Sequence, residues 1–309
     1  MTTTGCEGDA PVLPQRQKEI CTNPAPTKPG MSRRQVPTMK ERHYLLYLPE
    51  YYSAEYPVPL VIMAPSSFHS TQEQIITFDI MQFAERQQVA VLGLIAEKDE
   101  LNVVAKCHSN PGRPDDVWYV KEAVKDVANF VCIDWKRVVC LGFSRGARFC
   151  SRLGALYSEV ITGMATISGL RFPDPPNMRP MPIIAFHGTD DPINPYEGST
   201  TMPHWHDSVE ESVYKWSHHN QCQKVENTKW SEKVSVRHYT QCKDYADVTL
   251  VKVEGGGHTW PGCAKCKDSP WLKAVSHEIE ANIMIGAFFD GHARGPPPAA
   301  TGWIGLILV

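Results

Sequence analysis

The chain has 309 residues, of which 42% are hydrophobic, and a formal net charge of -3. This length is sufficient for one large α/β domain with a complete hydrophobic core, which we favour over two domains. The small charge, with no basic run beyond Arg33 and Arg34, argues against a nucleic-acid partner and against a polybasic membrane segment. No apolar stretch reaches the roughly 20 residues that a membrane-spanning helix needs.

The two ends of the chain differ in pattern from its middle. Residues 1–38 show no period of 2 or 3.6 and are predicted to form an irregular amino-terminal arm. Residues 39–290 alternate apolar with amphipathic segments and are predicted to form the folded domain. Residues 291–309, which contain GHARGPPPAATG, are expected to form an irregular carboxyl-terminal tail.

Apolar segments typical of strands recur along the domain. They are HYLLYLP (43–49), PLVIMAP (59–65), VAVLGLIA (89–96), RVVCLGF (137–143), ITGMATIS (161–168), PIIAFHG (182–188) and VTLVKVE (248–254). The clearest helix begins at Asp115 or Asp116, either of which is a natural N-cap, and has valines at helical spacing from Val117 to Val131. Weaker helical patterns lie near 77–88, 146–157, 207–219 and 276–290. The alternation predicts an α/β fold with a mostly parallel central sheet and helices on both faces.

The segment GFSRGAR (142–148) follows a predicted strand and leads into a predicted helix. Gly142 and Gly146 flank Ser144 as in the G-x-S-x-G turn, which exposes a nucleophilic serine at the end of a strand. In a chain with 21 glycines the pattern also arises by chance, so its context has to decide. A serine nucleophile needs a base, and the base needs a carboxylate that fixes its tautomer.

Two later strand ends supply these groups in the order serine, acid, histidine, which is the order in one fold of serine hydrolases. The strand at 182–188 leads into Asp190 and Asp191, and either aspartate fits the role of the acid. The strand at 248–254 leads into three glycines and then His258. Glycines allow the close backbone approach that a base in a crowded site requires.

Other histidines have spacings that could bind a metal ion. They are His204 with His206, and the neighbouring pair His218 and His219. No carboxylate or cysteine completes a recognisable ligand set around them, so we predict no metal and no cofactor.

Ten cysteines are more typical of an exported protein than of a cytosolic hydrolase. Cys132 and Cys140 lie in apolar segments and are predicted to be buried free thiols. Cys263 and Cys266 form a lone C-x-x-C, for which a local disulfide or two unlinked thiols is favoured over zinc.

Three segments carry a resemblance to a known family. GFSRGA, HGTDDPINPY and GGGHTWPG occur in this order and spacing, and RHYLLYLPEYY, DDVWYVKEAVKDV, IDWKRVVCLGFS and SVEESVYKW are similar to the family's intervening segments. Over roughly residues 42–290 the chain resembles a secreted esterase family of the α/β-hydrolase superfamily. This family is carbohydrate esterase family 1-like and includes extracellular polyhydroxybutyrate depolymerases, feruloyl esterases and acetylxylan esterases.

The resemblance implies an α/β-hydrolase fold and a role for individual residues. It implies Ser144 as the nucleophile, Asp191 rather than Asp190 as the acid, and His258 as the base. It implies that Trp260 is an aromatic residue that lines the site for the acyl or polymer chain. The alternative is that Trp260 is a core tryptophan that anchors the histidine loop.

The resemblance also implies a disulfide. Cys222 and Cys242 flank a polar, turn-rich segment before a strand, and they occupy positions where the family places paired cysteines. Together with the number of cysteines, the resemblance implies an extracellular location, although the amino-terminal MTTTGCEGDAPVLPQRQ lacks the basic and apolar segments of a signal peptide.

One segment departs from the family pattern. Where the family usually has His-Gly after a strand, this chain has Ala-Pro-Ser-Ser at 64–67, and Pro65 has no N–H to donate to an oxyanion hole. We expect the N–H of Arg145 as the first donor. The N–H of Ser67 is expected as the second, with Ser66 as the alternative.

The predicted function is that of a serine esterase that forms an acyl-enzyme and needs no cofactor. The ester partner is a hydroxyalkanoate polyester or a feruloylated or acetylated plant polysaccharide. A peptidase or thioesterase on the same fold is an alternative, since fold does not set the acyl group. A catalytically silent protein that binds glycan or lipid is the alternative from another class, and the altered segment 64–67 favours it.

Overall fold

The structure is a computed structural model that describes residues 27–67, 69–97, 100–103, 114–173, 178–202 and 204–292. Its strands are β1 (Gly30–Val36), β2 (Met39–Leu48), β3 (Val58–Ala64), β4 (Ala90–Leu94), β5 (Ile133–Phe143), β6 (Gly163–Ile167), β7 (Ile183–Gly188), β8 (Lys224–Lys229), β9 (Val234–Thr240) and β10 (Val248–Val253). Within the described part of the chain they form one 10-stranded sheet in the order β1-β2-β4-β3-β5-β6-β7-β10-β9-β8.

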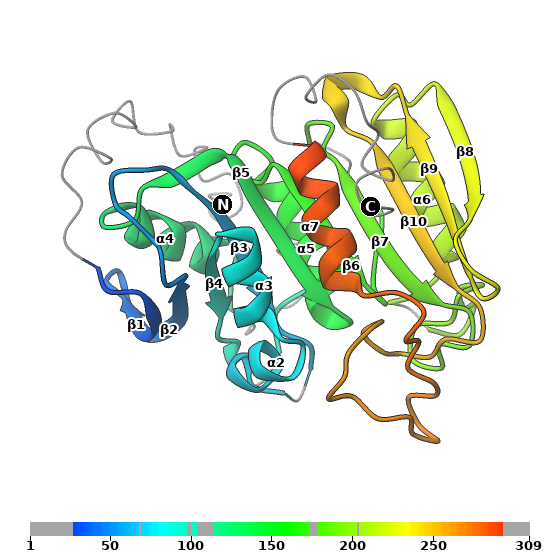
Figure 1. The fold of residues 1–309 in the computed structure, drawn as a ribbon, viewed down its shortest axis with the longest axis horizontal. Helices are drawn as coiled ribbons and strands as arrows, with labels where there is room; N and C mark the ends of the chain where they lie inside the picture. The colour runs from blue at the N-terminus through cyan, green and yellow to red at the C-terminus, as the bar shows by residue number, and fades with distance from the viewer. Residues whose placement is uncertain are drawn as a thin grey trace, which may run out of the picture.

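The middle of the sheet is parallel and its two edges are antiparallel. From β4 through β3, β5, β6 and β7 to β10, each neighbouring pair runs parallel. At the edges, β1 and β2 on one side and β8 and β9 on the other pair antiparallel. The carboxyl ends of the central strands therefore meet at one edge of the sheet, drawn at the bottom in Figure 1.

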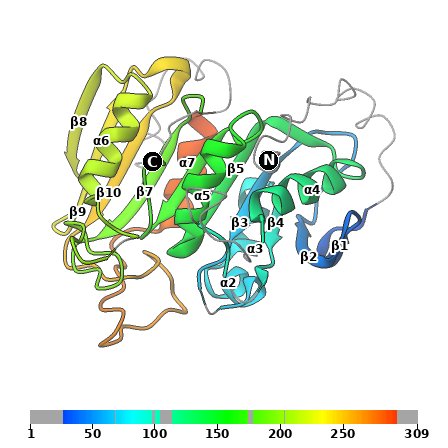
Figure 2. The same cartoon turned by 180° about the vertical axis from the view of Figure 1, so that it is seen from behind.

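Helices cover both faces of the sheet, as predicted. The helices are α2 (Thr71–Thr77), α3 (Ile80–Gln87), α4 (Asp116–Ala128), α5 (Arg145–Leu156), α6 (Val209–His219) and α7 (Ala281–Gly291), with a short 3-10 turn at Lys243–Tyr245. Figure 1 shows α2, α3 and α7 in front of the sheet, and the reverse view in Figure 2 shows α4, α5 and α6 on the other face. Each layer has its own apolar core against the sheet. None of the helices in the described residues is long and apolar enough to cross a membrane.

Three strands lie where sequence patterns did not predict them. Strand β1 falls inside the arm that was expected to be irregular over 1–38, and β8 and β9 form a hairpin in the polar stretch between Cys222 and Cys242. Strands β1 and β8 form the two edges of the sheet, and β9 alternates buried with more exposed residues. None of the three has the continuous apolar run of a buried parallel strand, so backbone pairing with β2 and β10 decides their structure. Residues 1–26 of the predicted arm and 293–309 of the predicted tail lie outside the described residues.

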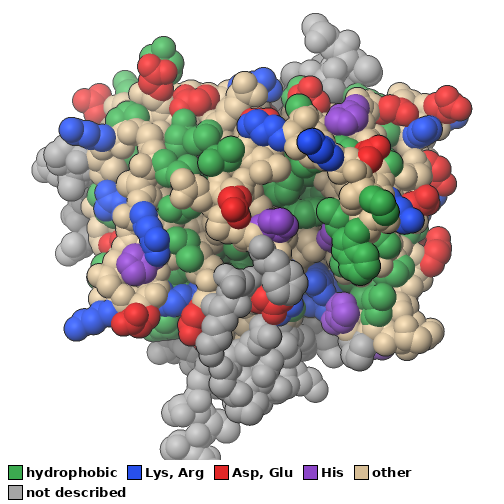
Figure 3. Space-filling model, turned by 90° about the horizontal axis from the view of Figure 1, so that it is seen from below, with side chains coloured by type: hydrophobic (Ala, Val, Ile, Leu, Met, Phe, Trp, Pro, Cys, Tyr) green, Lys and Arg blue, Asp and Glu red, His purple; other side chains and the backbone are tan. Residues whose placement is uncertain are grey.

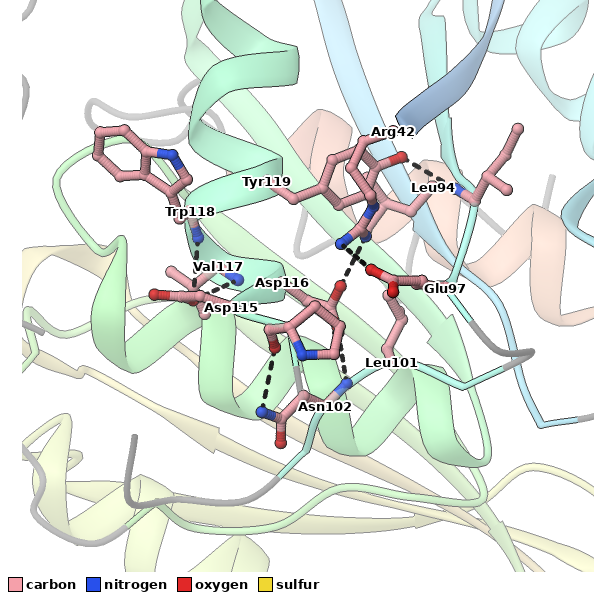
Figure 4. Close-up of polar contacts among 12 residues, drawn as sticks. Arg42, Leu94, Glu97, Leu101, Asn102, Asp115, Asp116, Val117, Trp118 and Tyr119 are labelled. Atoms are coloured by element: carbon pink, nitrogen blue, oxygen red, sulfur yellow. Dashed lines mark hydrogen bonds and ion pairs between the residues drawn. The ribbon is translucent and has the colours of Figure 1, made fainter. Parts of the chain in front are cut away.

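A buried ion pair connects the first part of the sheet to α4. The Arg42 guanidinium donates to Asp116 Oδ1 at 2.6 Å, and the Asn102 N–H donates to Asp116 Oδ2 at 2.6 Å (Figure 4). Burial raises the pKa of the Asp116 carboxyl, while the Arg42 charge and the Asn102 hydrogen bond oppose this rise. Asp115 is the N-cap and accepts from the N–H groups of Val117 and Trp118. The network holds segment 100–103 against the amino-terminal end of α4.

Candidate active site

Ser144 lies in a sharp turn between β5 and α5. Its backbone has a positive φ of 55° with ψ of -116°, a conformation that costs energy for a residue with a side chain. The Ser144 N–H donates to the Ile167 carbonyl at 2.8 Å, which ties the turn to the end of β6. Figure 3 shows the molecule from the edge of the sheet at which the central strands end, with hydrophobic, charged and histidine side chains mixed over this face. Ser144 therefore occupies a strained turn of the kind that presents a nucleophile.

Both glycines beside Ser144 are required by space. A Cβ at Gly142 would lie 2.3 Å from the Gly146 carbonyl carbon, and a Cβ at Gly146 would lie 2.0 Å from the Ala64 carbonyl oxygen. These distances are too short for any side chain in either position. Because Gly146 touches the backbone of Ala64 and Pro65, segment 64–67 lies directly beside the Ser144 turn. This contact explains why the serine is held between two glycines.

Asp191 and His258 are joined by a hydrogen bond at the ends of β7 and β10. His258 Nδ1 lies 2.8 Å from Asp191 Oδ2, and the two residues are 4% and 3% exposed respectively. Asp191 Oδ1 accepts from the N–H groups of Ile193 and Asn194 at 2.9 and 2.8 Å. Burial raises the pKa of Asp191, but hydrogen bonds from His187 and His258 outweigh burial and hold it well below its usual range. The carboxylate is thus ionised and bonded at both oxygens.

The imidazole of His258 lies next to the serine turn. Its ring centroid is 5.0 Å from that of Phe143, the residue immediately before Ser144. Since Nδ1 is engaged by Asp191, Nε2 is the ring nitrogen that can exchange a proton with a nearby group. Asp190, the other candidate for the acid, is exposed, and no hydrogen bond joins its side chain to His258 within the described residues.

A second histidine contacts the same carboxylate. His187 Nε2 donates to the Asn194 carbonyl at 2.8 Å and lies 3.3 Å from Asp191 Oδ2. The ring stacks on Trp205 with a centroid distance of 5.7 Å. In the sequence, His187 is recognisable only as a residue at the end of a predicted strand, directly before the loop that contains Asp191. Its contact with Asp191 was not predicted. His187 thus lies near the same oxygen of Asp191 that bonds to His258, and it is tied to the Asn194 carbonyl of the same loop.

The histidine loop is held by close backbone contacts. A Cβ at Gly188 would lie 2.1 Å from the Gly256 carbonyl oxygen, so the aspartate and histidine loops touch where both lack side chains. The His258 N–H donates to the Leu272 carbonyl at 2.8 Å, and the Thr259 hydroxyl donates to the Ala274 carbonyl at 3.0 Å. The loop that carries His258 is therefore supported on two sides.

The segment after β3 is shaped by a side chain of α2. The Ser66 N–H donates to Gln74 Oε1 at 3.0 Å, and Gln74 Nε2 donates to the His69 carbonyl at 3.3 Å. The Ser66 N–H is thus already committed to Gln74. Of the two serines in the segment, Ser67 has no hydrogen bond from its N–H to another residue that the structure describes.

Trp260 packs inside the protein rather than along its surface. Its side chain is 2% exposed and stacks on Phe78 with ring centroids 4.4 Å apart, and its edge faces Phe143 at 6.4 Å. This packing fits the alternative, a core residue that anchors the histidine loop, while the substrate-lining role expected from the resemblance stays a prediction.

The cysteines are paired more extensively than the sequence indicated. Cys222 and Cys242 form the expected disulfide, and Cys263 with Cys266 form a local one. The prediction of free thiols at Cys132 and Cys140 is wrong. Cys140 bonds to Cys150, because the Ser144 turn folds α5 back onto β5 and brings the two Cα atoms to 5.5 Å, and Cys132 is also disulfide-bonded.

The histidines with metal-like spacing do not come together with further ligands. Within the ranges that the structure describes, no group of three or more His, Cys, Asp or Glu side chains is placed to hold a metal ion.

Comparison with known proteins gives similarity to esterases over part of the chain. No protein-family profile matches. NocK of Nocardia uniformis subsp. tsuyamanensis, a protein named as an esterase, is 32% identical over 98 residues, 29% of this chain and 28% of its own. Feruloyl esterase B of Piromyces equi is 26% identical over 160 residues, 47% of this chain and 29% of its own. The chain thus covers less than a third of the length of either relative.

Solved structures show the same fold at low sequence identity. The acetyl xylan esterase from Aspergillus awamori matches with a TM-score of 0.53 and 14% identity, over 70% of this chain and 89% of that one. The structure described as native pOPH matches with a TM-score of 0.54 and 14% identity, over 90% of this chain and 96% of that one. Together with the parallel sheet and the turn at Ser144, these structural matches show an α/β-hydrolase fold, and the two sequence relatives show similarity to esterases over part of the chain.

Proposed function

We propose that the protein is a carboxylic ester hydrolase that uses Ser144 as nucleophile, His258 as base and Asp191 as the acid. The observation that carries this proposal is the buried hydrogen bond between His258 and Asp191, set beside the strained serine turn. The similarity to esterases in sequence supports the same reaction class.

The reaction proceeds in two acyl-transfer steps. His258 Nε2 takes the proton of the Ser144 hydroxyl while the oxygen forms a bond to the ester carbonyl carbon. The tetrahedral intermediate then breaks its bond to the alcohol oxygen, which receives the proton from His258. Water, deprotonated by the same nitrogen, attacks the acyl-enzyme and releases the carboxylic acid and free Ser144. Asp191 holds Nδ1–H and stabilises the imidazolium that forms in each step.

The negative charge on the carbonyl oxygen is stabilised by two backbone donors. Arg145 follows the nucleophile and begins α5, so its N–H is the first donor. Ser67 supplies the second, since the Ser66 N–H is bonded to Gln74. Gly146 supports this assignment because it places the segment that contains Ser67 against the serine turn.

The substrate class follows from the relatives rather than from a bound ligand. One relative is named a feruloyl esterase and one structural match an acetyl xylan esterase. We therefore extend the proposal to the ester of a plant polysaccharide, with a hydroxyalkanoate polyester as the other candidate. The disulfides support an oxidising compartment, and so an extracellular location.

Hydrolysis of methyl ferulate and of a hydroxybutyrate oligomer, measured side by side, tests the proposal. Ser144→Ala is the control for contaminating activity. Turnover of either ester that disappears in a folded Ser144→Ala protein supports the serine mechanism and selects the substrate branch. A folded wild-type protein that hydrolyses neither these esters nor simple alkyl esters contradicts it and favours a silent binding protein.

A further inference from the structure

Arg148 is a buried cation without a partner. It lies one helical turn after Ser144, and its N–H donates to the Ser144 carbonyl at 3.1 Å. The residue is 7% exposed, and its Nε has no hydrogen-bond partner. No hydrogen bond or ion pair joins the Arg148 guanidinium to any other residue that the structure describes. A guanidinium always carries its charge, so leaving it buried and unpaired is costly.

The surroundings of Arg148 add positive charge. Burial, together with the charges of Arg171 and Arg145, lowers the pKa of Arg148 to about 10, while the charges of Glu100 and Asp191 act in the opposite direction. Burial and then Arg145 likewise lower the pKa of Arg171 to about 10. Arg145 and Arg148 also lie in the first turn of α5, where the helix dipole favours negative groups. Arg145, Arg148 and Arg171 therefore form a cluster of positive charge, and both burial and the helix dipole disfavour this charge.

The nearby carboxylates are occupied elsewhere. Glu100 pairs with the Arg145 guanidinium at 3.2 Å. Asp191 is bonded to two histidines and to two backbone N–H groups. Neither carboxylate contacts Arg148. The charge that would balance Arg148 is thus absent from the described protein.

The other arginines of the cluster are held in place by backbone carbonyls. Arg145 Nε donates to the Leu101 carbonyl at 2.8 Å, and Arg171 donates to the carbonyls of Val103 and His204 at 3.1 and 2.7 Å. Segment 100–103, which accepts two of these bonds, is itself fixed by Asp116 through the Asn102 N–H (Figure 4). The cluster is rigid, so it is suited to bind an anion without rearrangement.

From these observations we propose that Arg148, with Arg171 beside it, binds a carboxylate of the substrate, so that the preferred ester is an anion. This inference rests on the proposed esterase activity and refines its substrate class. A guanidinium binds a carboxylate by two parallel hydrogen bonds, and Arg148 has unused donors for them. An ester that carries a carboxylate close to its scissile bond would neutralise the buried charge and place its carbonyl carbon at Ser144.

Two matched pairs of esters test this on the protein as it exists. In the first pair, kcat/KM for monomethyl glutarate is compared with kcat/KM for dimethyl glutarate, corrected for the two ester groups of the diester. This pair tests a carboxylate on the acyl side of the scissile bond. In the second pair, the release of acetate from 3-acetoxybutyrate is compared with its release from the methyl ester of 3-acetoxybutyrate. This pair tests a carboxylate on the alcohol side of the scissile bond. We expect wild-type kcat/KM to favour the charged member of at least one pair at low salt, and the preference to shrink as salt screens it. A preference for the neutral member of both pairs would overturn the proposal.

Variants assign the preference to one residue. Arg148→Gln should lower the ratio of charged to neutral kcat/KM by about tenfold or more, as expected for a lost charged hydrogen bond. Arg148→Lys should retain part of the ratio. Arg152→Gln is the matched control, because Arg152 lies on the same helix and already donates to the Asn102 carbonyl at 2.6 Å. An equal fall in Arg152→Gln, or an unchanged ratio in Arg148→Gln, contradicts the proposal; if the variants do not fold, the wild-type pairs decide.

Binding of free glutarate separates the two proposals. Calorimetric titration of glutarate into Ser144→Ala protein needs no turnover. Binding there, with no ester hydrolysed by wild type, leaves the anion site intact and removes the esterase. Hydrolysis of neutral esters with no glutarate binding and no charge preference keeps the esterase and removes the anion site.

Discussion

Asp191 Oδ2 lies 2.8 Å from His258 Nδ1, while Asp190, one residue earlier, is exposed. An amide at Asp191 would keep its oxygen toward the N–H groups of Ile193 and Asn194 and turn its NH2 toward His258. The imidazole would then carry its proton on Nε2 and could not accept one from Ser144. We expect Asp191→Asn to lower kcat on the order of a thousandfold or more.

Asp190→Asn is the matched control for this prediction and should change kcat less than about threefold, because its surroundings are solvated. Both variants are assayed on one soluble ester, with thermal unfolding to confirm that each is folded. Equal losses in the two variants would count against Asp191 as the acid.

Gln74 is expected to act as a positioning residue for the segment 64–67. Replacing it by Leu removes the acceptor of the Ser66 N–H and the donor to the His69 carbonyl. The loss of order in a donor loop should lower kcat on the order of tenfold to a hundredfold with little change in KM. Gln74→Glu, which keeps an acceptor oxygen at the same reach, should recover part of kcat. A change confined to KM, or to stability alone, would show that Gln74 does not position an oxyanion donor.

The sequence predicted the strands of the central sheet because buried parallel strands are continuous apolar runs. The same reasoning led from their ends to Ser144 and His258, since the carboxyl ends of parallel strands share one edge. It left Asp190 and Asp191 open, because neighbouring residues on a turn differ only in the direction of the side chain. The 2.8 Å contact with His258 distinguishes them.

What sequence reasoning missed depends on contacts between distant segments. In the β8 and β9 hairpin, β8 is exposed along its whole length and β9 buries only alternate residues, so neither has a continuous apolar run and both depend on pairing with β10 and with each other. Cys140 was predicted to be a buried free thiol because it lies in an apolar segment, and only the fold of α5 onto β5 brings it to Cys150. Arg148 gave no signal either, since an arginine on a helix is ordinarily solvated; its burial is a tertiary property.

Gly146→Ala should destabilise the protein strongly. The added Cβ would lie 2.0 Å from the Ala64 carbonyl oxygen, and backbone cannot move aside as a side chain can. We expect a loss of about 3 kcal/mol in the free energy of unfolding, or failure to fold. Gly286→Ala is the control, because its Cβ would meet only the end of the Gln87 side chain, at 2.4 Å. Urea unfolding of both variants checks this, and similar stabilities would contradict the close contact at Gly146.

Removal of the disulfide between Cys222 and Cys242 should cost stability without affecting the site. This bond closes a loop of sequence separation 20 around the β8 and β9 hairpin, at the sheet edge away from Ser144. Replacing both cysteines by alanine should lower the free energy of unfolding by about 3 kcal/mol. The double alanine variant of Cys263 and Cys266, with a separation of 3, should lose less. A larger loss for the short loop would contradict the ordering.

The buried imidazole of His238 should make stability depend on pH. Burial lowers its pKa to about 4, with Asp247 opposing this effect, whereas an imidazole in the unfolded chain titrates near 6.5. Between these values the unfolded state binds more protons, so stability falls as pH decreases, at a rate of up to about 1.4 kcal/mol per pH unit from this group. The free energy of unfolding is measured with urea at pH 7 and at pH 5, on either side of the unfolded-state pKa of about 6.5. His238→Gln, which can still bond to the Thr249 hydroxyl, should lose less stability between these two pH values than wild type does. His218→Gln, on the exposed side of α6, is the control and should leave the slope as in wild type. A wild-type slope in His238→Gln would assign the acid sensitivity to other groups, and a fall that is steeper in that variant would reverse the sign expected for a buried neutral imidazole.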